Sequence, residues 1–296
     1  MVATASDAAR ETPRASPLSA ATRAFSAFRR HEMTDVAASL TYYAMMSLFP
    51  LVIVATSLFS LVGDRATVTH AVDYLARQGA DATTQQAVRN VMDKIVSASG
   101  GAVSVALVVS LLIALNGASG AFGAAGRALN RVYEIAEDRG FVRRKFTDLG
   151  MTLVLVVVLL VIIAALFLGG GIAKDLLGTV GLGGTAATIW SIVRWPIALA
   201  AMLLAYALIY AYAPDLEPRR LRWITAGSVA GVAIWIVASI AFGIYIRHFS
   251  TYGAAYGAAG AAIVLLLWLW LSCCAFLYGA ELNAELEREP SAPPEA

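Results

Sequence analysis

The stretch MTLVLVVVLLVIIAALFLGGG, from Met151 to Gly171, decides the fold class of this chain. Every position except Thr152 is apolar or glycine, so the stretch shows no alternation of polar and apolar residues. A helix needs about 20 apolar residues to cross the hydrocarbon core of a bilayer. A strand of a membrane barrel would instead be a segment of about 10 residues with alternating polarity. The stretch therefore predicts a transmembrane helix.

The composition of the whole chain extends this prediction. Of its 296 residues, 59% are apolar and only 14% are charged, and the mean hydropathy is +0.71. An ordinary soluble domain has about 25% charged residues. These values exclude a disordered chain, a disulfide-stapled secreted domain and a nucleic-acid binder with a broad basic face. The two cysteines, Cys273 and Cys274, are adjacent in an apolar run and are interpreted as packing residues.

We predict an all-α polytopic membrane protein with six transmembrane helices in one domain, residues 23–287. The flanking segments 1–22 and 288–296 are predicted to be disordered tails, because they are rich in Ala, Ser, Pro and charged residues. Between the first two spans, residues 64–100 show apolar residues at helical spacing and predict two amphipathic helices on the outer face. They either cover the bundle or form a lid over a cavity. The predicted spans are about 36–62, 102–122, 149–172, 189–212, 223–246 and 256–280.

The basic residues predict the orientation, because Lys and Arg are enriched in cytoplasmic loops. The N-terminal segment has five, the second loop six, the fourth loop three and the C-terminal tail one, so 15 of the 22 fall on one side. The seven on the other side include four in the first loop, where four aspartates balance them. Both termini are therefore predicted to be cytoplasmic. No long apolar run lies in the first 30 residues, so no cleavable signal peptide is expected.

Small residues occur in helical register and predict close helix packing. Helices in lipid associate through van der Waals contact, which small residues bring closer. The fifth predicted span has Gly227 and Gly231, and the sixth has Gly253 and Gly257. Four glycines follow one another at steps of three residues along the end of the second span, at positions 117, 120, 123 and 126. A hinge, or a cavity lined by backbone, is the functional alternative.

Several polar residues lie inside the first two predicted spans. Pro50 is expected to kink the first span, and Tyr42, Tyr43 and Ser47 give it a polar stripe. Tyr43 and Ser47 are four residues apart and share a helix face. This arrangement suits a path for a solute and equally suits hydrogen bonding between helices. Asn116 in the second span is expected to bond to a neighbouring helix.

Two polar groups lie at the predicted cytoplasmic helix ends. One follows the second span, and the other, Glu281, Asn283 and Glu285, ends the sixth. Arg–Glu pairs between the groups are one interpretation, and interfacial anchoring is the other. The first group consists of Arg127, Asn130, Arg131, Tyr133 and Glu134.

Catalytic signatures are missing from the sequence. It contains no HExxH, GxSxG, GxxxxGK[ST] or paired CxxC motif, and His31, His70 and His248 lie in different segments. The sequence therefore predicts a protein that is not an enzyme, with no catalytic residues, metal or cofactor.

Four segments resemble the BrkB/YihY family of bacterial inner-membrane proteins. The resemblance covers about residues 25–287, and the ending GAELN after an apolar span with a W-L-W core is its most specific part. Trp270 stands where the family often has Tyr. The segments are AASLTYYAMMSLFPL (37–51), RALNRVYE (127–134), YAPDLEPRRLRW (212–223) and YGAAGAAIVLLLWLWLSCCAFLYGAELNAEL (256–286).

The resemblance implies a six-helix protein of the bacterial inner membrane with cytoplasmic termini. Members have been labelled virulence or serum-resistance factors, and some relatives have been connected with lipid export. We therefore expect a transporter or translocator of lipids or solutes that contributes to envelope function. Its partners would be membrane lipids and a lipid or small-molecule substrate, not nucleic acid, with homo-oligomers left open. A non-transporting scaffold is the alternative. The family's tRNA-processing ribonuclease label is widely regarded as a misassignment.

Overall fold

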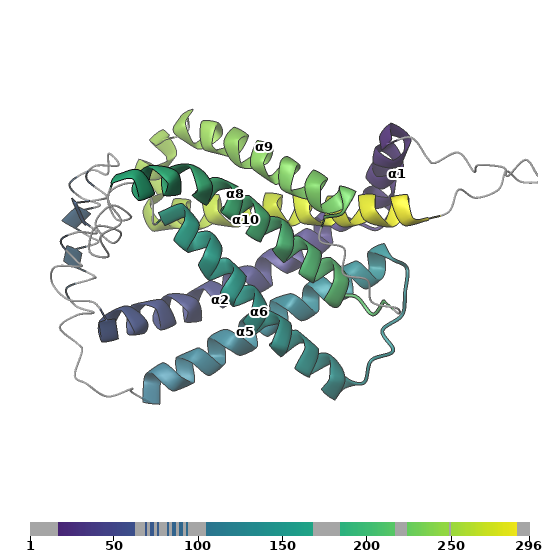
Figure 1. The fold of residues 1–296 in the computed structure, drawn as a ribbon, viewed down its shortest axis with the longest axis horizontal. Helices are drawn as coiled ribbons and strands as arrows, with labels where there is room; N and C mark the ends of the chain where they lie inside the picture. Colours follow the sequence, from purple (N-terminus) through teal and green to yellow (C-terminus); the bar gives the residue numbers. More distant parts are fainter. Residues whose placement is uncertain are drawn as a thin grey trace, which may run out of the picture.

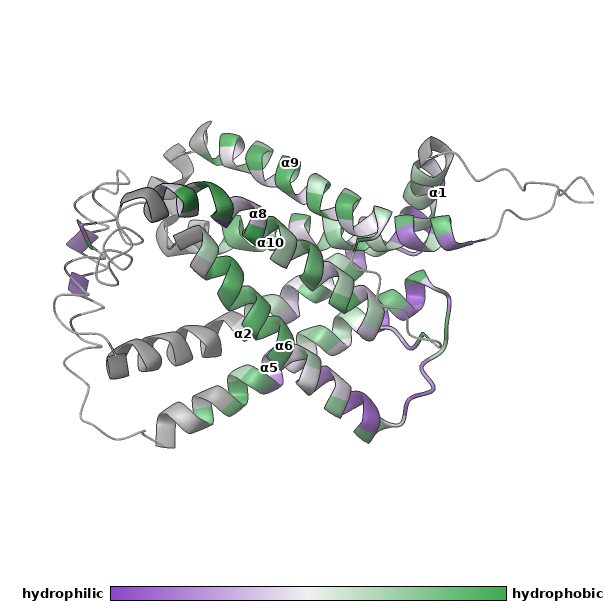
Figure 2. Ribbon diagram, viewed as in Figure 1, coloured by the Kyte–Doolittle hydropathy of each residue, from purple (hydrophilic) through white to green (hydrophobic). Residues whose placement is uncertain are grey.

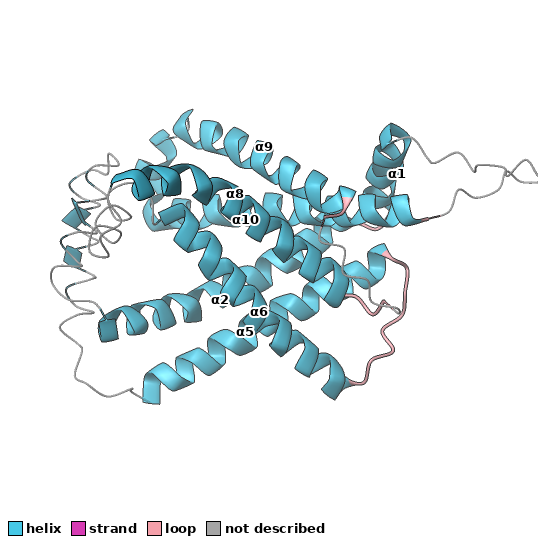
Figure 3. Cartoon of the chain, viewed as in Figure 1, coloured by secondary structure: helices cyan, strands magenta, loops and turns pink. Residues whose placement is uncertain are grey.

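The computed structural model describes residues 17–62, 105–167, 184–216, 224–248 and 250–288, together with ten isolated positions between 69 and 93. All regular structure within these ranges is helical (Figure 3). The helices are α1 (Pro17–Arg30), α2 (Met33–Val62), α5 (Val105–Val132), α6 (Phe141–Phe167), α8 (Gly184–Tyr212), α9 (Ala226–His248) and α10 (Ser250–Glu287).

The helices pack in pairs that are joined into one bundle. The closest partners are α9 with α10, α2 with α5, and α6 with α8, and contacts of α10 with α2 and of α5 with α6 connect the pairs. The short helix α1 packs on α10, at the end of the bundle where α10 finishes. At the opposite end, the last turns of α2 and the first turns of α5 lie apart from α9 and α10 (Figure 1).

Among the described residues, four helices are long and apolar enough to cross a membrane, namely α6, α8, α9 and α10. Only 17–28% of the residues in their most apolar windows are buried, so most of these side chains are wholly or partly exposed on the bundle surface. Apolar surface on this scale is typical of helices in contact with lipid. The helices α2 and α5 coincide with the first two predicted spans, but they are not among these four, so the count of six remains a prediction.

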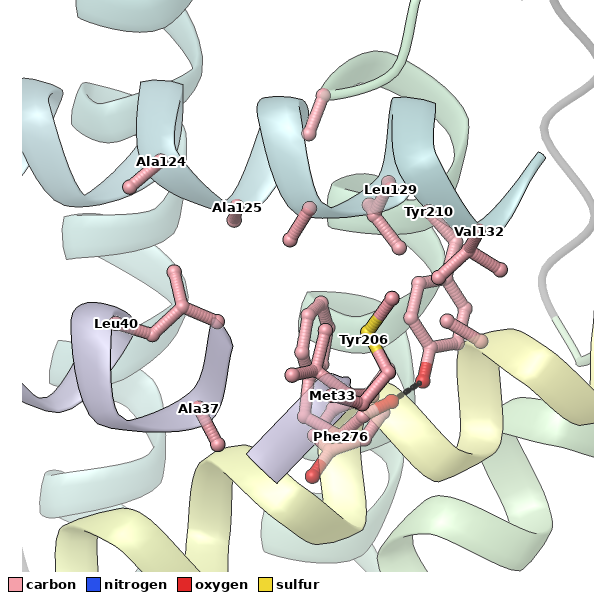
Figure 4. Packing of buried hydrophobic residues seen from close by; sticks show 14 of the residues in the cluster. Met33, Ala37, Leu40, Ala124, Ala125, Leu129, Val132, Tyr206, Tyr210 and Phe276 are labelled. Carbon is pink, nitrogen blue, oxygen red and sulfur yellow. Dashed lines mark hydrogen bonds between the residues drawn. The ribbon is translucent and has the colours of Figure 1, made fainter. Parts of the chain in front are cut away.

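The buried core lies at one end of the bundle, which we call the polar end and define as residues 29–35, 127–145, 213–216 and 281–288. Hydrophilic residues gather there (Figure 2). The core beneath them is built from the first turns of α2 and α9 and the last turns of α5, α8 and α10. In Figure 4, the Tyr210 hydroxyl donates a hydrogen bond of 2.6 Å to the Phe276 carbonyl oxygen. The largest fully buried apolar side chains of this core are Met33, Leu129, Leu277 and Val132.

Several boundaries differ from the sequence predictions. The helix α1 begins at Pro17, so residues 17–22 of the predicted disordered tail are helical. Ala20, Ala24 and Ala27 recur on one face of α1 and are almost completely buried, which explains why this short helix packs on α10. At their polar ends, α5 continues ten residues past its predicted span and α6 begins eight residues early.

Little of the predicted outer segment 64–100 lies within the described residues. The ten described positions are all helical, and Val72 is buried while its neighbour Asp73 is exposed, as an amphipathic helix requires. The choice between a cover and a lid stays a prediction.

Glycines produce the closest helix crossing in the bundle. A Cβ atom at Gly227 would overlap the carbonyl oxygen of Gly279, and one at Gly279 would lie 2.7 Å from the Tyr210 hydroxyl. At Gly231, a Cβ would lie 2.9 Å from the Tyr206 ring. Gly227 and Gly231 therefore lie where two helices approach closely, as their predicted packing role requires. The side-chain surroundings of the other pair, Gly253 and Gly257, are outside the described part of the structure.

Gly227→Ala tests this crossing against Gly243→Ala, a change on the same helix where a new Cβ meets nothing within 4 Å. Overpacking costs about 1–3 kcal/mol, so we expect Gly227→Ala to lower the unfolding temperature of the purified protein in detergent. Gly243→Ala should leave that temperature unchanged or raise it slightly, since Ala favours helix over Gly. Equal unfolding temperatures for the two variants would contradict the close crossing.

Candidate functional site

The end of α5 places an acidic side chain in an unfavourable backbone conformation. Glu134 has a φ angle of 54°, in the left-handed region where glycine is preferred. The Ile135 amide donates to the Asn130 carbonyl (2.9 Å) and the Glu134 amide to the Arg131 carbonyl (3.2 Å), which together form a Schellman ending. A left-handed residue other than glycine costs roughly 1–2 kcal/mol. Such strain is typical of positions whose side chain has a function.

The carboxylate of Glu134 faces a histidine that joins two acidic groups. His31 Nδ1 lies 2.7 Å from Glu281 Oε1, and His31 Nε2 lies 3.4 Å from Glu134 Oε1. Glu281 is completely buried on α10, whereas the Glu134 side chain is 57% exposed. Within the described part of the chain, Glu281 Oε2 has no hydrogen-bond partner. We call His31, Glu134 and Glu281 the His31 relay.

Arginines surround the relay at the polar end. Arg288 Nη2 lies 2.7 Å from Glu134 Oε1, and its Nη1 lies 2.9 Å from Glu285 Oε1. Arg23 of α1 binds the other oxygen of Glu285 at 3.0 Å. The hydrogen bond from Arg288 holds the pKa of Glu134 below its ordinary value. Glu134 is therefore ionised near neutral pH.

Pairing of Arg127 or Arg131 with Glu281 or Glu285, one of the two interpretations of the sequence, is not found, because both glutamates bind other partners. Arg127 lies over the Tyr43 ring, 5.9 Å from its centre, and Arg131 pairs with Glu32 at 3.1 Å. The two predicted groups nevertheless meet, since His31 and Arg288 connect Glu134 to α10. The sequence could not indicate His31 because its partners are 103 and 250 residues away along the chain.

A second ionic group fastens the loop after α5 to the end of α8. The buried Arg139 guanidinium binds both oxygens of Glu137 at 2.6 and 2.7 Å and donates to the Ala213 carbonyl at 2.9 Å. Asp215 lies 3.3 Å from the same guanidinium. Asn130 accepts a hydrogen bond from the Asp215 amide at 2.8 Å and donates one to Glu137 at 3.1 Å. This group is structural, because all its members bind one another.

Asn283 also has a structural role, at the start of α9. Its Oδ1 accepts a hydrogen bond from the Gly227 amide (2.8 Å), and its Nδ2 donates to Thr225 Oγ1 (2.9 Å). Thr225 and Ser228 exchange amide-to-hydroxyl hydrogen bonds of 3.0 Å, in the manner of a capping box. The amide group of α10 thus satisfies a backbone donor that the first turn of α9 leaves unpaired.

Tyr43 and Asn116, two of the polar residues predicted within the first two spans, lie where α5 packs against α2 and α6. Lys145 of α6 donates to Asn116 Oδ1 (3.1 Å) and Ser119 Oγ (3.2 Å) of α5, so the expected bond from Asn116 to a neighbouring helix is confirmed. Gly120 lies against the Tyr43 ring, over which Arg127 is placed. We call the group the α2–α5–α6 patch: Tyr43, Asn116, Ser119, Arg127, Lys145 and Asp148.

The glycines of α5 allow the helices of this patch to approach. A Cβ at Gly117 would touch Ser47, one at Gly123 would lie 2.7 Å from Asp148 Oδ2, and one at Gly126 would lie 2.7 Å from the Ala213 carbonyl oxygen. The close packing predicted for this series is observed at Gly123 and Gly126, whereas a Cβ at Gly117 or Gly120 would meet its nearest neighbour at an ordinary 3.8 Å. Ser47 donates to the Ala44 carbonyl of its own helix at 2.7 Å.

Two other positions predicted in the first span, Tyr42 and Pro50, are not part of this patch. Tyr42 is exposed and its ring contacts that of Tyr43 edge to face. The helix α2 continues through position 50, but the surroundings of Pro50 are outside the described residues, so its kink stays a prediction. Among the residues that the structure describes, no group of three or more His, Cys, Asp or Glu side chains has a metal-binding arrangement.

Comparison with known proteins places these residues in a family. The family model described as "Virulence factor BrkB" matches residues 24–296. A Bacillus subtilis protein named as ribonuclease-like, YfkH, is 29% identical over 92% of this chain and 96% of its own length. A UPF0761 membrane protein of Rhodospirillum centenum is 28% identical over 85% of this chain but only 53% of its own length. A UPF0761 membrane protein of Alteromonas mediterranea is 25% identical over 87% of this chain and 84% of its own length. No solved structure matches the chain.

Arg139→Met tests the structural ionic group. Removing one partner of a buried ion pair leaves uncompensated charge and costs about 3–5 kcal/mol, so a large fall in unfolding temperature is expected. Arg131→Met is the matched control, because the Arg131–Glu32 pair is exposed and such pairs contribute about 0–1 kcal/mol. If the two variants unfold alike, Arg139 does not fasten the loop.

The acid dependence of stability tests the Arg139–Glu137 pair separately. The hydrogen bond from Arg139 lowers the pKa of Glu137 below its ordinary 4.5. A carboxyl with a lowered native pKa stabilises the fold fully above its unfolded pKa, and the contribution is lost as the pH falls through the native pKa. Glu137→Gln should therefore reduce the fall in unfolding temperature between about pH 5 and about pH 3. Asp35→Asn, at an exposed position, is the control. If the unfolding temperature of Glu137→Gln fell as much as that of the wild type, the Arg139–Glu137 pair would not be the source of the acid dependence.

Proposed function

The chain belongs to the BrkB virulence-factor family of membrane proteins, and we propose that it is a translocator of lipids or amphipathic solutes. In this proposal the α2–α5–α6 patch binds the anionic headgroup of the substrate. The protein lies in the bacterial inner membrane as a six-span bundle with both termini cytoplasmic, as the basic residues predict. The observation that carries the proposal is the excess of positive charge in the patch.

The charge of the patch favours an anionic ligand. Its cations are Lys145 and Arg127, its single carboxylate is Asp148, and Arg144 adds positive charge beside Asp148. The ammonium group of Lys145 is bound by neutral oxygens of Asn116 and Ser119, not by a carboxylate. Ionisable groups within membrane-spanning helices are costly and are often functional. A phosphate or carboxylate headgroup would supply the missing negative charge.

The position of the patch supports access from the bilayer. Asn116 and Arg127 are exposed, and Tyr42 beside them is 60% exposed. Arg127 and Lys145 of the patch belong to the polar end, and away from that end the apolar side chains of α5 and α6 are exposed. Leu112, Ile113, Leu153 and Val157 are among these exposed side chains and offer contacts for acyl chains. An amphipathic ligand therefore finds a polar and an apolar surface side by side.

Lys145→Gln tests the ligand class. We expect native mass spectrometry of the purified protein to show retained anionic phospholipid in the wild type and roughly tenfold weaker retention in the variant, about 1.4 kcal/mol. Lys145→Arg should retain the lipid, and Arg131→Gln at the exposed Glu32 pair is the matched control. In proteoliposomes, a fluorescent anionic phospholipid should cross the bilayer faster with wild type than with Lys145→Gln.

Two outcomes would contradict the proposal. If the wild type retained anionic and zwitterionic lipids equally, the patch would not be a site for an anionic headgroup. Anionic lipid that is bound at Lys145 but never crosses the bilayer would favour the scaffold alternative over translocation.

A further inference from the structure

The His31 relay connects a completely buried carboxyl group to water, and nothing in the translocation proposal uses it. Glu281 lies within a helix apolar enough to span a membrane and is 0% exposed. A buried carboxylate without a full set of partners is unfavourable. In the described residues Glu281 has one partner, His31, and its second oxygen accepts no hydrogen bond. Both facts are typical of a group that binds a proton.

His31 has the geometry to move that proton. Its two ring nitrogens face different carboxylates, Nδ1 the buried Glu281 at 2.7 Å and Nε2 the exposed Glu134 at 3.4 Å. An imidazole can take up a proton at one nitrogen and release one from the other. When Nε2 receives a proton from Glu134, Nδ1 passes its own proton to Glu281 Oε1. The ring carries one proton before and after the step, and no electrons are transferred.

The conformation of Glu134 supports a role for its side chain beyond packing. It occupies the left-handed position at the end of α5, where glycine would be less strained. Its exposed ion pairs with Arg288 and Arg30 contribute only about 0–1 kcal/mol, which does not explain why a strained glutamate is present. Contact with His31 is the remaining feature of this side chain.

We propose that Glu281 is a proton-binding site that exchanges its proton with solvent at the polar end through His31 and Glu134. This proposal is independent of the lipid site, since the two share no residue. Charged and titratable groups face the relay from every helix end packed around it. They are Arg23 and Arg30 of α1, Glu32 before α2, Tyr133 after α5, and Glu285, Glu287 and Arg288 at the end of α10.

Infrared spectroscopy of the full chain in lipid nanodiscs tests the proposal, because a protonated carboxyl has its own absorption band. We expect a protonated-carboxyl band in the wild type that is lost as the pH is raised. Glu281→Gln should abolish this band. Glu285→Gln is the matched control: it removes a buried carboxylate one turn further along α10, bound to Arg23 and Arg288 and not to His31.

Two variants separate proton exchange from structural support. His31→Asn keeps a donor toward Glu281 but loses the Nε2 side, and Glu134→Gly removes the second carboxylate while relieving the backbone strain. We expect the carboxyl band of each to exchange with deuterium at least tenfold more slowly than that of the wild type. Glu134→Gly should unfold within a few degrees of the wild type, so its slower exchange would not reflect a damaged fold.

The proposal is overturned if the wild-type band does not titrate, or if it survives in Glu281→Gln. It is equally overturned if His31→Asn and Glu134→Gly exchange as fast as the wild type. A result of either kind leaves lipid retention at Lys145 unaffected, so the two proposals fail separately.

Discussion

The close crossing of α9 and α10 is the contact on which the polar end depends. Helices in lipid gain little from burying apolar side chains against one another, so backbone approach and polar bonds must hold them. At Gly227, Gly231 and Gly279 the two backbones approach until no side chain fits between them. This approach lets Asn283 of α10 bind the first turn of α9. It also fixes the rotation of α10, so that Glu281 faces His31 and not lipid.

Much of the fold was predictable because lipid imposes a simple pattern on sequence. Apolar stretches of sufficient length predicted α6, α8, α9 and α10. The regularly spaced glycines of α5 and α9 predicted the faces on which these two helices pack. The errors were at helix ends. The helix α5 continues past its predicted span because Asn130 and Arg131 find polar partners at the polar end. The helix α1 was not predicted because its buried face consists of alanines, which add little to the hydropathy of the segment.

Several residues of the site were singled out from the sequence, but His31, Lys145 and the pairs that they form were not. Asn116, Arg127, Glu134 and Glu281 were singled out because polar groups near membrane depth are costly. Their partners come from other helices: Lys145, Tyr43 and His31. The four segments that carry the family resemblance show the same principle. Asn130 from one binds Asp215 from another, and the Glu281 segment meets α9 and His31 at the polar end. Pairing of this kind depends on helix rotation, which a single sequence does not specify.

The two proposed sites share two helices although they share no residue. Helix α2 begins two residues after His31 and carries Tyr43, and α5 carries Asn116 and Arg127 and ends two residues before Glu134. At 1.5 Å per residue, the 12 residues from His31 to Tyr43 span about 18 Å. Between them, Ala37 and Leu40 are packed against the core that α5 helps to build. A rotation of α2 against α5 would therefore change the Tyr43–Arg127 contact and the His31–Glu134 distance together.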